Sequence, residues 1–344
     1  MKILILKRDK LGDLLLTTPT IQLIQQHYPD AEIHLLASEY SAWVADGSTC
    51  IKKIWAYPRV RTGKKISVIA GIKQLLQILA LRKERFDWAI AAGGEYSPRA
   101  VSRLKYMNAR QTISFMPEDV ADPKITHPVK IIKEGHEALR MAQLLSPLGM
   151  TAPNTVESLP PIEFHPSPAM LLEAQEFLSE HQLQAGNYWV LGLGARRQKK
   201  QPTSMQIKTW SQTMYDQYGL KTVFMWTPGQ SNDPLNPGDD DTAQEVLKIC
   251  SKEVVIPFRG PLKPAIGLIW GAKTSLFPDS GLMHFASASP GGVTGLFADI
   301  THSPNPYQWG PLGTKSSYLI APDSVSQLSD AVVLDALQSK LVIE

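Results

Sequence analysis

The stretch that decides the fold is MKILILKRDKLGDLLLTTPTIQLIQQHYPDAEIHLL, residues 1–36. The apolar run at 3–6 predicts a buried strand, and residues 19–28 carry isoleucine and tyrosine at the spacing of one helix face. A second apolar run at 32–36 follows the turn at Pro29-Asp30 and predicts another strand. Strand, helix and strand in this order form a βαβ unit, so the sequence predicts an α/β fold with a parallel sheet.

The alternation of strands and helices continues, and a proline-rich segment interrupts it once. Before that segment we expect helices at 66–82 and 134–145 and a strand at 88–91. Between residues 147 and 168 six prolines break any regular element, as in an interdomain linker. We therefore expect two doubly wound domains, 1–155 and 156–344, facing each other across a cleft. The elements expected in the second are helix 169–181, strand 188–192, helix 204–218, strand 222–226, helix 242–250, strand 254–256, helix 265–271, strand 275–277, helix 282–288 and strand 293–297.

Composition and charge exclude several classes of protein. The 344 residues are 43% hydrophobic and 19% charged, which suits packed globular cores rather than a disordered or fibrous chain. The net charge of +3 is too small for wholesale nucleic-acid binding, and two cysteines are too few for a disulfide framework, which favours the cytoplasm. The apolar run at 3–6 is too short for an export signal, and no apolar stretch reaches the roughly 18 residues of a membrane span. Any membrane contact is therefore expected to be peripheral.

The first candidate functional group is Asp13, in Lys10-Leu11-Gly12-Asp13 directly after the first strand. Gly12 permits a tight turn that presents the carboxylate at the carboxyl edge of the sheet, where it can act as a general base. The structural alternative is that Asp13 caps the next helix. Thr18-Pro19 also makes a good cap and first helical position, which leaves Asp13 less clearly needed for capping.

The second candidate is Asp279-Ser280-Gly281-Leu282-Met283-His284, between an expected strand and an expected helix. The amides of Ser280, Gly281 and Leu282 at a helix N-terminus can hold a phosphate, and Gly281 allows close approach. An ordinary Asp or Ser cap explains the same spacing equally well. His284 falls about one turn inside the helix, where we expect it either to face the phosphates from behind the amides or to be a hydrogen-bonded core group.

Two cationic segments suggest anionic ligands. Residues 194–200 place Arg196, Arg197, Lys199 and Lys200 after an expected strand, where they can neutralise a departing diphosphate. Residues 47–83 hold nine cations and no Asp or Glu, and we expect some of them to bind an anionic acceptor or lipid headgroups. In both segments a solvated surface is the alternative, and sparse aromatic residues argue against nucleic acid. The residues expected to bind the acceptor in the second segment are Arg59, Arg61, Lys64 and Lys65.

The sequence indicates no metal site and no cofactor site. Asp239-Asp240-Asp241 follows Pro237-Gly238 and precedes a helical pattern, so loop solvation and helix capping account for it better than a cation does. No histidine or cysteine cluster has zinc spacing. Neither Gly-x-Gly-x-x-Gly nor a Walker loop occurs, which argues against a dehydrogenase or an ATPase.

Three motifs together resemble glycosyltransferase family 9, which contains the ADP-heptose:lipopolysaccharide heptosyltransferases. They are residues 10–19 (KLGDLLLTTP), residues 226–229 (WTPG), and residues 279–286 (DSGLMHFA) with Trp309-Gly310-Pro311. Two departures are visible. The family's Lys-x-Trp-Pro reads Lys199-Lys200-Gln201-Pro202 here, and its Phe-Gly-Pro-Thr-Asp reads Phe297-Ala298-Asp299-Ile300-Thr301.

The resemblance implies two Rossmann-like domains of the GT-B type and an inverting, metal-independent sugar transfer. It implies that Asp13 is the general base, that Gly12 lies on the acceptor side, and that the C-terminal domain holds a nucleotide sugar such as ADP-heptose. Alignment with the family motif favours Lys199 for the diphosphate, with Lys200 as the alternative. The implied acceptor is a lipopolysaccharide core or related glycolipid at the inner face of the cytoplasmic membrane. The competing hypotheses are another donor, such as a UDP-sugar, and a nucleotide-binding module without turnover.

Overall fold

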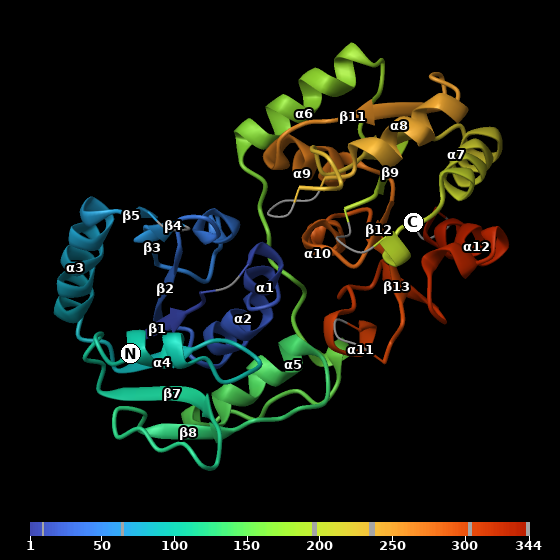
Figure 1. Ribbon diagram of the computed structural model, residues 1–344. Helices are drawn as coiled ribbons and strands as arrows, with labels where there is room; N and C mark the ends of the chain where they lie inside the picture. Colours follow the sequence, from blue (N-terminus) through green and yellow to red (C-terminus); the bar gives the residue numbers. More distant parts are fainter. Residues whose placement is uncertain (9, 63–64, 195–197, 234–237, 302–304, 342–344) are drawn as a thin grey trace. The chain divides into compact units, whose positions relative to one another are not determined.

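A computed structural model describes residues 1–8, 10–62, 65–194, 198–233, 238–301 and 305–341. The chain forms two compact units, Met1–His165 and Pro166–Glu344, so the division follows residue 165 rather than residue 155. Each unit contains a six-stranded sheet in which every described strand pair is parallel (Figure 1). The α/β fold with two Rossmann-like domains is therefore confirmed.

The sheet of the first unit has β1 and β6 as its two central strands. Residues Ile3–Leu6 of β1 are all buried, and β1 pairs with β2 on one side and β6 on the other. The strand order is β3-β2-β1-β6-β7-β8. The strands are β1 (Lys2–Leu6), β2 (Glu32–Ser38), β3 (Lys53–Tyr57), β6 (Trp88–Ala91), β7 (Gln111–Met116) and β8 (His127–Lys130), and a separate hairpin joins β4 (Arg61–Thr62) to β5 (Lys65–Ile66).

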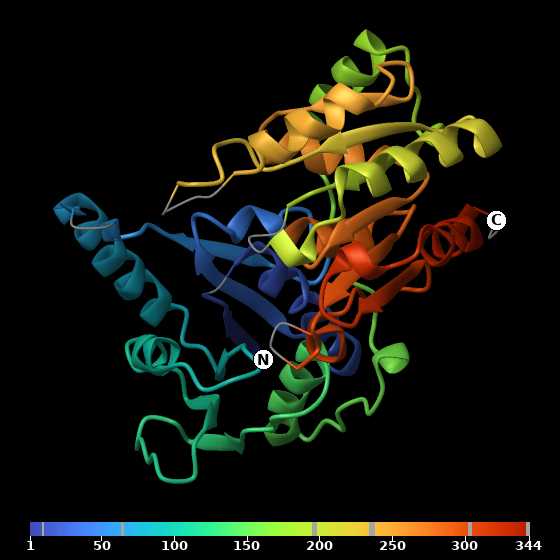
Figure 2. The same cartoon turned by 45° about the vertical axis from the view of Figure 1, so that its right-hand side comes forward.

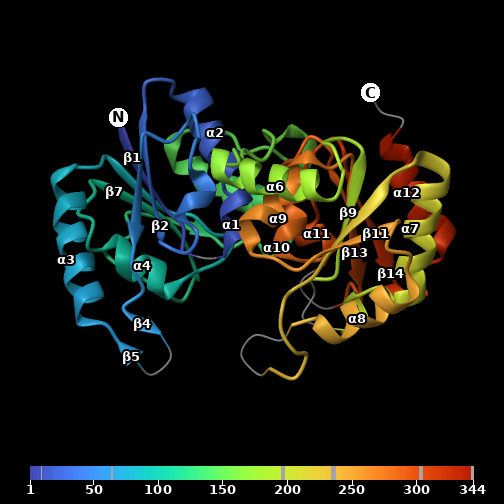
Figure 3. The ribbon, with the colours of Figure 1, turned by 90° about the horizontal axis from the view of Figure 1, so that it is seen from above.

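Helices cover both faces of this sheet. Leu81 of α3 and Ala100, Val101 and Leu104 of α4 belong to one core cluster with residues of β1 and β6. Helices α2 and α5 pack against each other, and Figure 3 shows α1 and α2 across β1 from α3. The helices are α1 (Leu11–Leu15), α2 (Thr18–His27), α3 (Val68–Lys83), α4 (Pro98–Leu104) and α5 (Glu137–Ala142), with 3₁₀ segments at Ala42–Ala45, Gln143–Leu148 and Val156–Ser158.

The helix expected at 134–145 is shorter than its pattern indicated. Gly135 has a φ of +92°, outside the helical range, so α5 begins only after His136. The His136 ring accepts a hydrogen bond from the Ala138 amide at 3.2 Å and caps the helix. Pro147 lies in the 3₁₀ segment that follows, where a proline removes one backbone donor.

The second unit repeats the topology of the first. Its strand order β11-β10-β9-β12-β13-β14 places the first strand of the unit, β9, in the middle. The order reverses between β9 and β12, as it does between β1 and β6, and ligands of such sheets bind beyond the carboxyl ends at this switch point. The strands are β9 (Tyr188–Gly192), β10 (Lys221–Met225), β11 (Val255–Phe258), β12 (Ser275–Pro278), β13 (Val293–Ala298) and β14 (Ser316–Ala321).

Two core clusters assign the helices of the second unit to the two faces of its sheet. One cluster joins α7, α8 and α12 to the sheet, and the other joins α6, α9 and α10 to it (Figures 1 and 3). Figure 2 again shows red α12 near yellow α7. The helices are α6 (Pro168–Glu180), α7 (Ser204–Tyr218), α8 (Asp240–Ile249), α9 (Leu262–Gly271), α10 (Gly281–Ala288), α11 (Pro306–Trp309) and α12 (Asp330–Leu341), with 3₁₀ segments at Gln198–Lys200 and Val325–Gln327.

Among the described residues, the structure contains no helix with both the length and the apolar character needed to cross a membrane.

Candidate functional site

Asp13 lies in α1, the short helix that follows β1. The helix begins at Leu11, and the Lys10 amide donates a hydrogen bond to Asp13 Oδ2 at 3.1 Å. Asp13 therefore does take part in capping, although in a helix of its own rather than in α2, which begins at Thr18. Gly12 is buried within α1, while Asp13 is half-buried and retains access to solvent.

A small cavity opens at Asp13. Its volume is about 310 Å³, and it is lined by Arg8, Lys10, Asp13, Tyr40 and Arg59. Arg59 is exposed and stands over the Tyr40 ring, with its guanidinium carbon 5.1 Å from the ring centroid. Three cations around one carboxylate favour a ligand that carries negative charge next to a group able to give up a proton.

The other residues of the predicted acceptor cluster are described only in part. Arg61 lies in β4 and Lys65 in β5, where the description is confined to the backbone, and Lys64 lies outside the described residues. Arg59 is the one of these four cations whose side chain the structure describes, and it lines the Asp13 cavity.

Arg8 is a cavity residue that the sequence analysis did not single out. It is the second residue after the end of β1, at the carboxyl edge of the sheet, and its Nε is buried without a hydrogen-bond partner among the described residues. The sequence feature that could have identified Arg8 is its position just after the apolar run at 3–6. An unpaired buried guanidinium nitrogen is a donor for an incoming anion.

The loop between β12 and α10 forms the second group. Ser280 is the N-cap of α10 with extended backbone, and its carbonyl accepts from the Met283 amide at 3.2 Å. The amides of Gly281 and Leu282 precede that bond and have no partner within the helix. Ser280 Oγ is buried and has no hydrogen-bond partner among the described residues. A Cβ built on Gly281 would meet no described atom within 4 Å, and one built on Gly194 would lie 3.8 Å from Ser280 Oγ. The ends of β9 and β12 therefore meet beside a helix N-terminus that favours an anion.

Lys200 brings a cation to this loop. Its Nζ lies 2.6 Å from Asp279 Oδ2, and the exposed fractions of the two side chains are 9% and 12%. Lys199 points to a different partner, since its Nζ lies 2.7 Å from Asp299 Oδ2 and 3.5 Å from Asp323 Oδ1, with 35% of its side chain exposed. The hydrogen bond to Asp299 raises the pKa of Lys199 above its ordinary value. The structure thus groups Lys200, and not Lys199, with the Asp279-Ser280-Gly281 segment.

The remaining predicted residues of this loop are buried or partly buried. His284 is buried one turn inside α10, and its carbonyl accepts a hydrogen bond from Ser287 Oγ at 2.9 Å. Leu282 packs against the core cluster of this face. Arg196 and Arg197 lie outside the described residues.

The acidic triplet 239–241 organises the loop after β10. Asp240 binds Arg259 through two hydrogen bonds of 2.8 and 2.9 Å and accepts from Trp226 Nε1 at 2.8 Å, contacts that hold the pKa of Asp240 well below its ordinary value. Asp239 accepts from Gln201 Nε2 at 2.6 Å, and burial raises its pKa. Asp241 accepts from Ser231 Oγ at 2.9 Å. The three carboxylates therefore serve separate partners instead of converging on one point.

A larger cavity of about 820 Å³ lies beside this triplet, at the N-termini of α7 and α8. One cation, Lys199, and three carboxylates, Asp239, Asp241 and Glu245, contribute to its lining. An excess of carboxylates disfavours phosphate, whereas carboxylate and hydroxyl oxygens suit the hydroxyl groups of a sugar.

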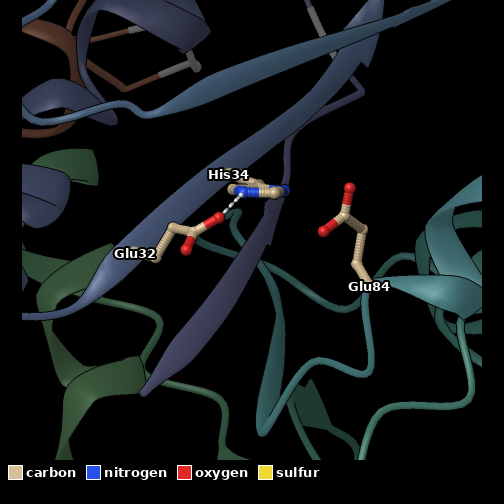
Figure 4. A group of neighbouring side chains, drawn as sticks. All are labelled: Glu32, His34 and Glu84. Atoms are coloured by element: carbon tan, nitrogen blue, oxygen red, sulfur yellow. Dashed lines mark hydrogen bonds and ion pairs between the residues drawn. The ribbon is translucent and has the colours of Figure 1, made fainter.

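One cluster in the first unit has the composition of a metal site without the chemistry of one. Ligand atoms of Glu32, His34 and Glu84 lie within 4.8 Å of one another (Figure 4). Trp55 Nε1 donates to His34 Nδ1 at 3.1 Å, which places the ring hydrogen on Nε2, facing Glu32 Oε1 at 2.9 Å. Lys2 Nζ lies 2.9 Å from Glu84 and 3.5 Å from Glu32. A lysine and a histidine N–H thus occupy the positions that a cation would need.

The same fold occurs in solved glycosyltransferases. A family 9 glycosyltransferase from Veillonella parvula is 19% identical with a TM-score of 0.82 over 100% of this chain and 97% of that chain. E. coli heptosyltransferase WaaC with ADP is 19% identical with a TM-score of 0.74 over 99% and 100%. E. coli ADP-heptose lps heptosyltransferase II is 18% identical with a TM-score of 0.71 over 99% and 99%. No protein-family model and no curated protein matches the chain. The GT-B fold expected from the motif resemblance is confirmed.

Proposed function

We propose that this chain is a divergent family 9 glycosyltransferase that moves a sugar from a nucleotide-sugar donor to an anionic glycolipid. The observation that carries the proposal is the helix N-terminus at Ser280-Gly281, which has a buried hydroxyl without a partner among the described residues and a lysine–carboxylate pair beside it. Helix amides and a lysine suit a diphosphate. Two similar proteins support the donor class, since WaaC was solved with ADP and the other is named ADP-heptose lps heptosyltransferase II.

In the proposed reaction Asp13 takes the proton of the acceptor hydroxyl. The acceptor oxygen then forms a bond to the anomeric carbon of the donor while the bond from that carbon to the diphosphate oxygen breaks. Direct displacement from the opposite side inverts the anomeric configuration. The nucleoside diphosphate leaves with its negative charge on the α10 amides and Lys200.

The acceptor is proposed to be negatively charged because the Asp13 cavity contains Arg8, Lys10 and Arg59. Phosphate or carboxylate groups of a lipopolysaccharide core fit this charge. We include Arg61, Lys64 and Lys65 in the proposed acceptor surface on the basis of the sequence. A glycolipid acceptor also implies work at the inner surface of the cytoplasmic membrane.

Incubation of the purified protein with ADP-heptose and a heptose-deficient lipopolysaccharide core tests the proposal. We expect release of ADP that depends on the acceptor, together with a product whose mass increases by one heptose and whose anomeric configuration is inverted by NMR. Acceptor-dependent release of UDP from a UDP-sugar in the same assay would support a glycosyltransferase that uses a UDP-sugar instead of ADP-heptose. ADP binding by calorimetry without any turnover would favour the nucleotide-binding module.

A strain that lacks the protein provides the second measurement. The mass spectrum of its glycolipid is expected to be short by the mass of the transferred sugar. An unchanged glycolipid spectrum would count against this acceptor class.

A further inference from the structure

Helix α3 presents an apolar face to solvent. Its six exposed large apolar residues recur at helical spacing, and at 100° per residue they occupy an arc of about 120°. Monomeric soluble proteins rarely leave a continuous apolar patch of this kind uncovered. The residues and their exposed fractions are Val68 71%, Ile69 69%, Ile72 55%, Leu75 58%, Leu76 60% and Leu79 47%.

The opposite side of α3 holds the helix on its own unit through hydrogen bonds and through Leu81 and Ile78, which pack with the core cluster of the first sheet. Gln77 Nε2 donates to the carbonyl of Ala56 in β3 at 2.9 Å, and Gln74 Nε2 donates to the carbonyl of Pro58 at 2.5 Å. Ala70 and Leu81 are the fully buried residues of the helix. Figures 1 and 3 show α3 at the margin of its unit, beyond the edge strand β3. The outward apolar residues are therefore not needed for the core of this unit.

The charged residues of α3 are all cations. Lys73, Arg82 and Lys83 are exposed on α3 itself, and residues 47–83 contain nine cations without one Asp or Glu. The nearest acid along the chain, Glu84, is paired with Lys2 at 2.9 Å and Lys53 at 3.2 Å. An apolar strip flanked by cations is complementary to an anionic lipid surface.

We propose that α3 is a membrane-docking helix that lies flat in the headgroup region of an anionic bilayer. The six apolar residues would enter the boundary with the acyl chains, and Lys73, Arg82 and Lys83 would reach lipid phosphates. The 16 residues of α3 are fewer than the roughly 20 needed to span a bilayer, which agrees with a helix parallel to the surface. The proposal concerns the protein alone and does not depend on sugar transfer.

Flotation with vesicles that contain no acceptor tests the docking. The wild-type chain is expected to float with phosphatidylcholine–phosphatidylglycerol vesicles, to float much less with phosphatidylcholine alone, and to be released by high salt. The triple variant Ile72→Gln, Leu76→Gln, Leu79→Gln is expected to lose vesicle binding by about 10-fold or more, because three side chains no longer partition into the bilayer.

A matched control uses exposed leucines elsewhere. Leu171→Gln with Leu172→Gln changes two exposed leucines of α6, a helix that carries Glu173, Glu176 and Glu180 and no cation. This variant is expected to bind vesicles like the wild type. Equal binding by the wild type and the α3 variant would overturn the proposal, as would absence of wild-type binding to anionic vesicles.

Tryptophan fluorescence and light scattering test separately whether α3 contacts the bilayer or a second copy of the chain. In Leu76→Trp the fluorescence emission of the added tryptophan is expected to shift to the blue when anionic vesicles are added. Brominated lipid in the vesicles is expected to quench this emission more than it quenches the emission of the wild type. An unshifted spectrum in the presence of bound vesicles would overturn the assignment to α3. A wild-type dimer in light scattering that the triple variant converts to a monomer, without any vesicle binding, would instead assign the face to a second copy of the chain.

Discussion

Asp13 has one structural contact and one proposed chemical role, and substitutions can separate them. Asp13→Asn keeps an oxygen that can accept from the Lys10 amide, so stability is expected to change by less than about 0.5 kcal/mol. The loss of the proton acceptor is expected to lower kcat by about 10²-fold to 10⁴-fold while ADP binding stays the same. Asp13→Ala also removes the capping contact and should cost about 1 kcal/mol in addition. Turnover close to the wild-type rate in Asp13→Asn would exclude the base assignment.

Lys200 and Lys199 make a matched pair for the phosphate-binding role. Lys200→Met removes the cation from the Asp279 loop and leaves that carboxylate unpaired, so the Kd for ADP is expected to rise by about 10-fold or more. Lys199→Met removes a more exposed lysine that binds Asp299 and Asp323, so its effect on ADP binding is expected to be smaller. Calorimetric titration with ADP measures both. A larger increase in Kd for Lys199→Met than for Lys200→Met would instead support Lys199, the residue that the motif alignment favours.

The sequence alone does not decide which of Lys199 and Lys200 binds the diphosphate. Adjacent lysines are equivalent in composition and charge, and their directions depend on the 3₁₀ turn at Gln198–Lys200 and on which carboxylates lie nearby. Asp299, the partner of Lys199, is 100 residues away in sequence. The residue types of the Asp13 and Ser280 segments are visible in the sequence, whereas contacts at this distance require the fold.

Helix α10 allows function to be separated from stability. Gly281 is its first residue, and a Cβ there would meet no described atom within 4 Å. Gly281→Ala is therefore expected to fold and to gain up to about 0.5 kcal/mol from reduced backbone entropy of the unfolded chain. The same methyl group would occupy the approach to the α10 amides and weaken ADP binding. Chemical unfolding measures the expected gain in stability, and titration with ADP measures the expected loss of affinity in the same variant. Unchanged ADP affinity would contradict the proposed position of the phosphate at the α10 amides.

Helix α12 contains a lysine whose burial predicts a pH effect. Lys340 is buried, its Nζ donates to the Lys315 carbonyl at 2.9 Å, and burial lowers its pKa from 10.5 to about 8. Between these pH values the unfolded chain binds more protons than the folded chain, so stability is expected to rise from pH 8 to 10.5. Lys340→Met should remove this rise and increase stability near pH 7 by about 1 kcal/mol. Urea unfolding at several pH values measures this change in the free energy of unfolding, with the exposed Lys252→Met as the control. If Lys340→Met still showed the rise in stability from pH 8 to 10.5, Lys340 would not be its cause.

The elements that the sequence predicted best are the buried ones. The strands at 88–91 and 188–192 coincide with β6 and β9 because a strand buried on both faces is a continuous apolar run. Edge strands β3 and β14 are half exposed and mix polar with apolar residues, so their patterns resemble loops. Helix α1 has only five residues, too few for a helical period to be detected.

At the scale of the whole molecule, the distribution of cations predicts how transfer responds to chelators. The α10 amides, Lys200 and the cations of the Asp13 cavity supply positive charge, and the carboxylates of 239–241 are held by separate partners. Transfer is therefore expected to be unaffected by EDTA. Activity lost in EDTA and restored by Mg²⁺ or Mn²⁺ would assign a cation to the site, and binding of that cation to Asp239→Asn should then be measured.

The division after residue 165 has a consequence for synthesis of the protein. Every described strand of the first sheet precedes that residue, so the first unit needs no strand from the second to complete its sheet. At roughly 5–20 residues per second, a ribosome takes about 10 to 35 s to add residues 166–344. The first unit therefore has time to fold as a nascent chain while the second is still being translated. A folding error in the second unit removes no strand from the first sheet, so we expect limited proteolysis of such a chain to leave a fragment that ends near residue 165.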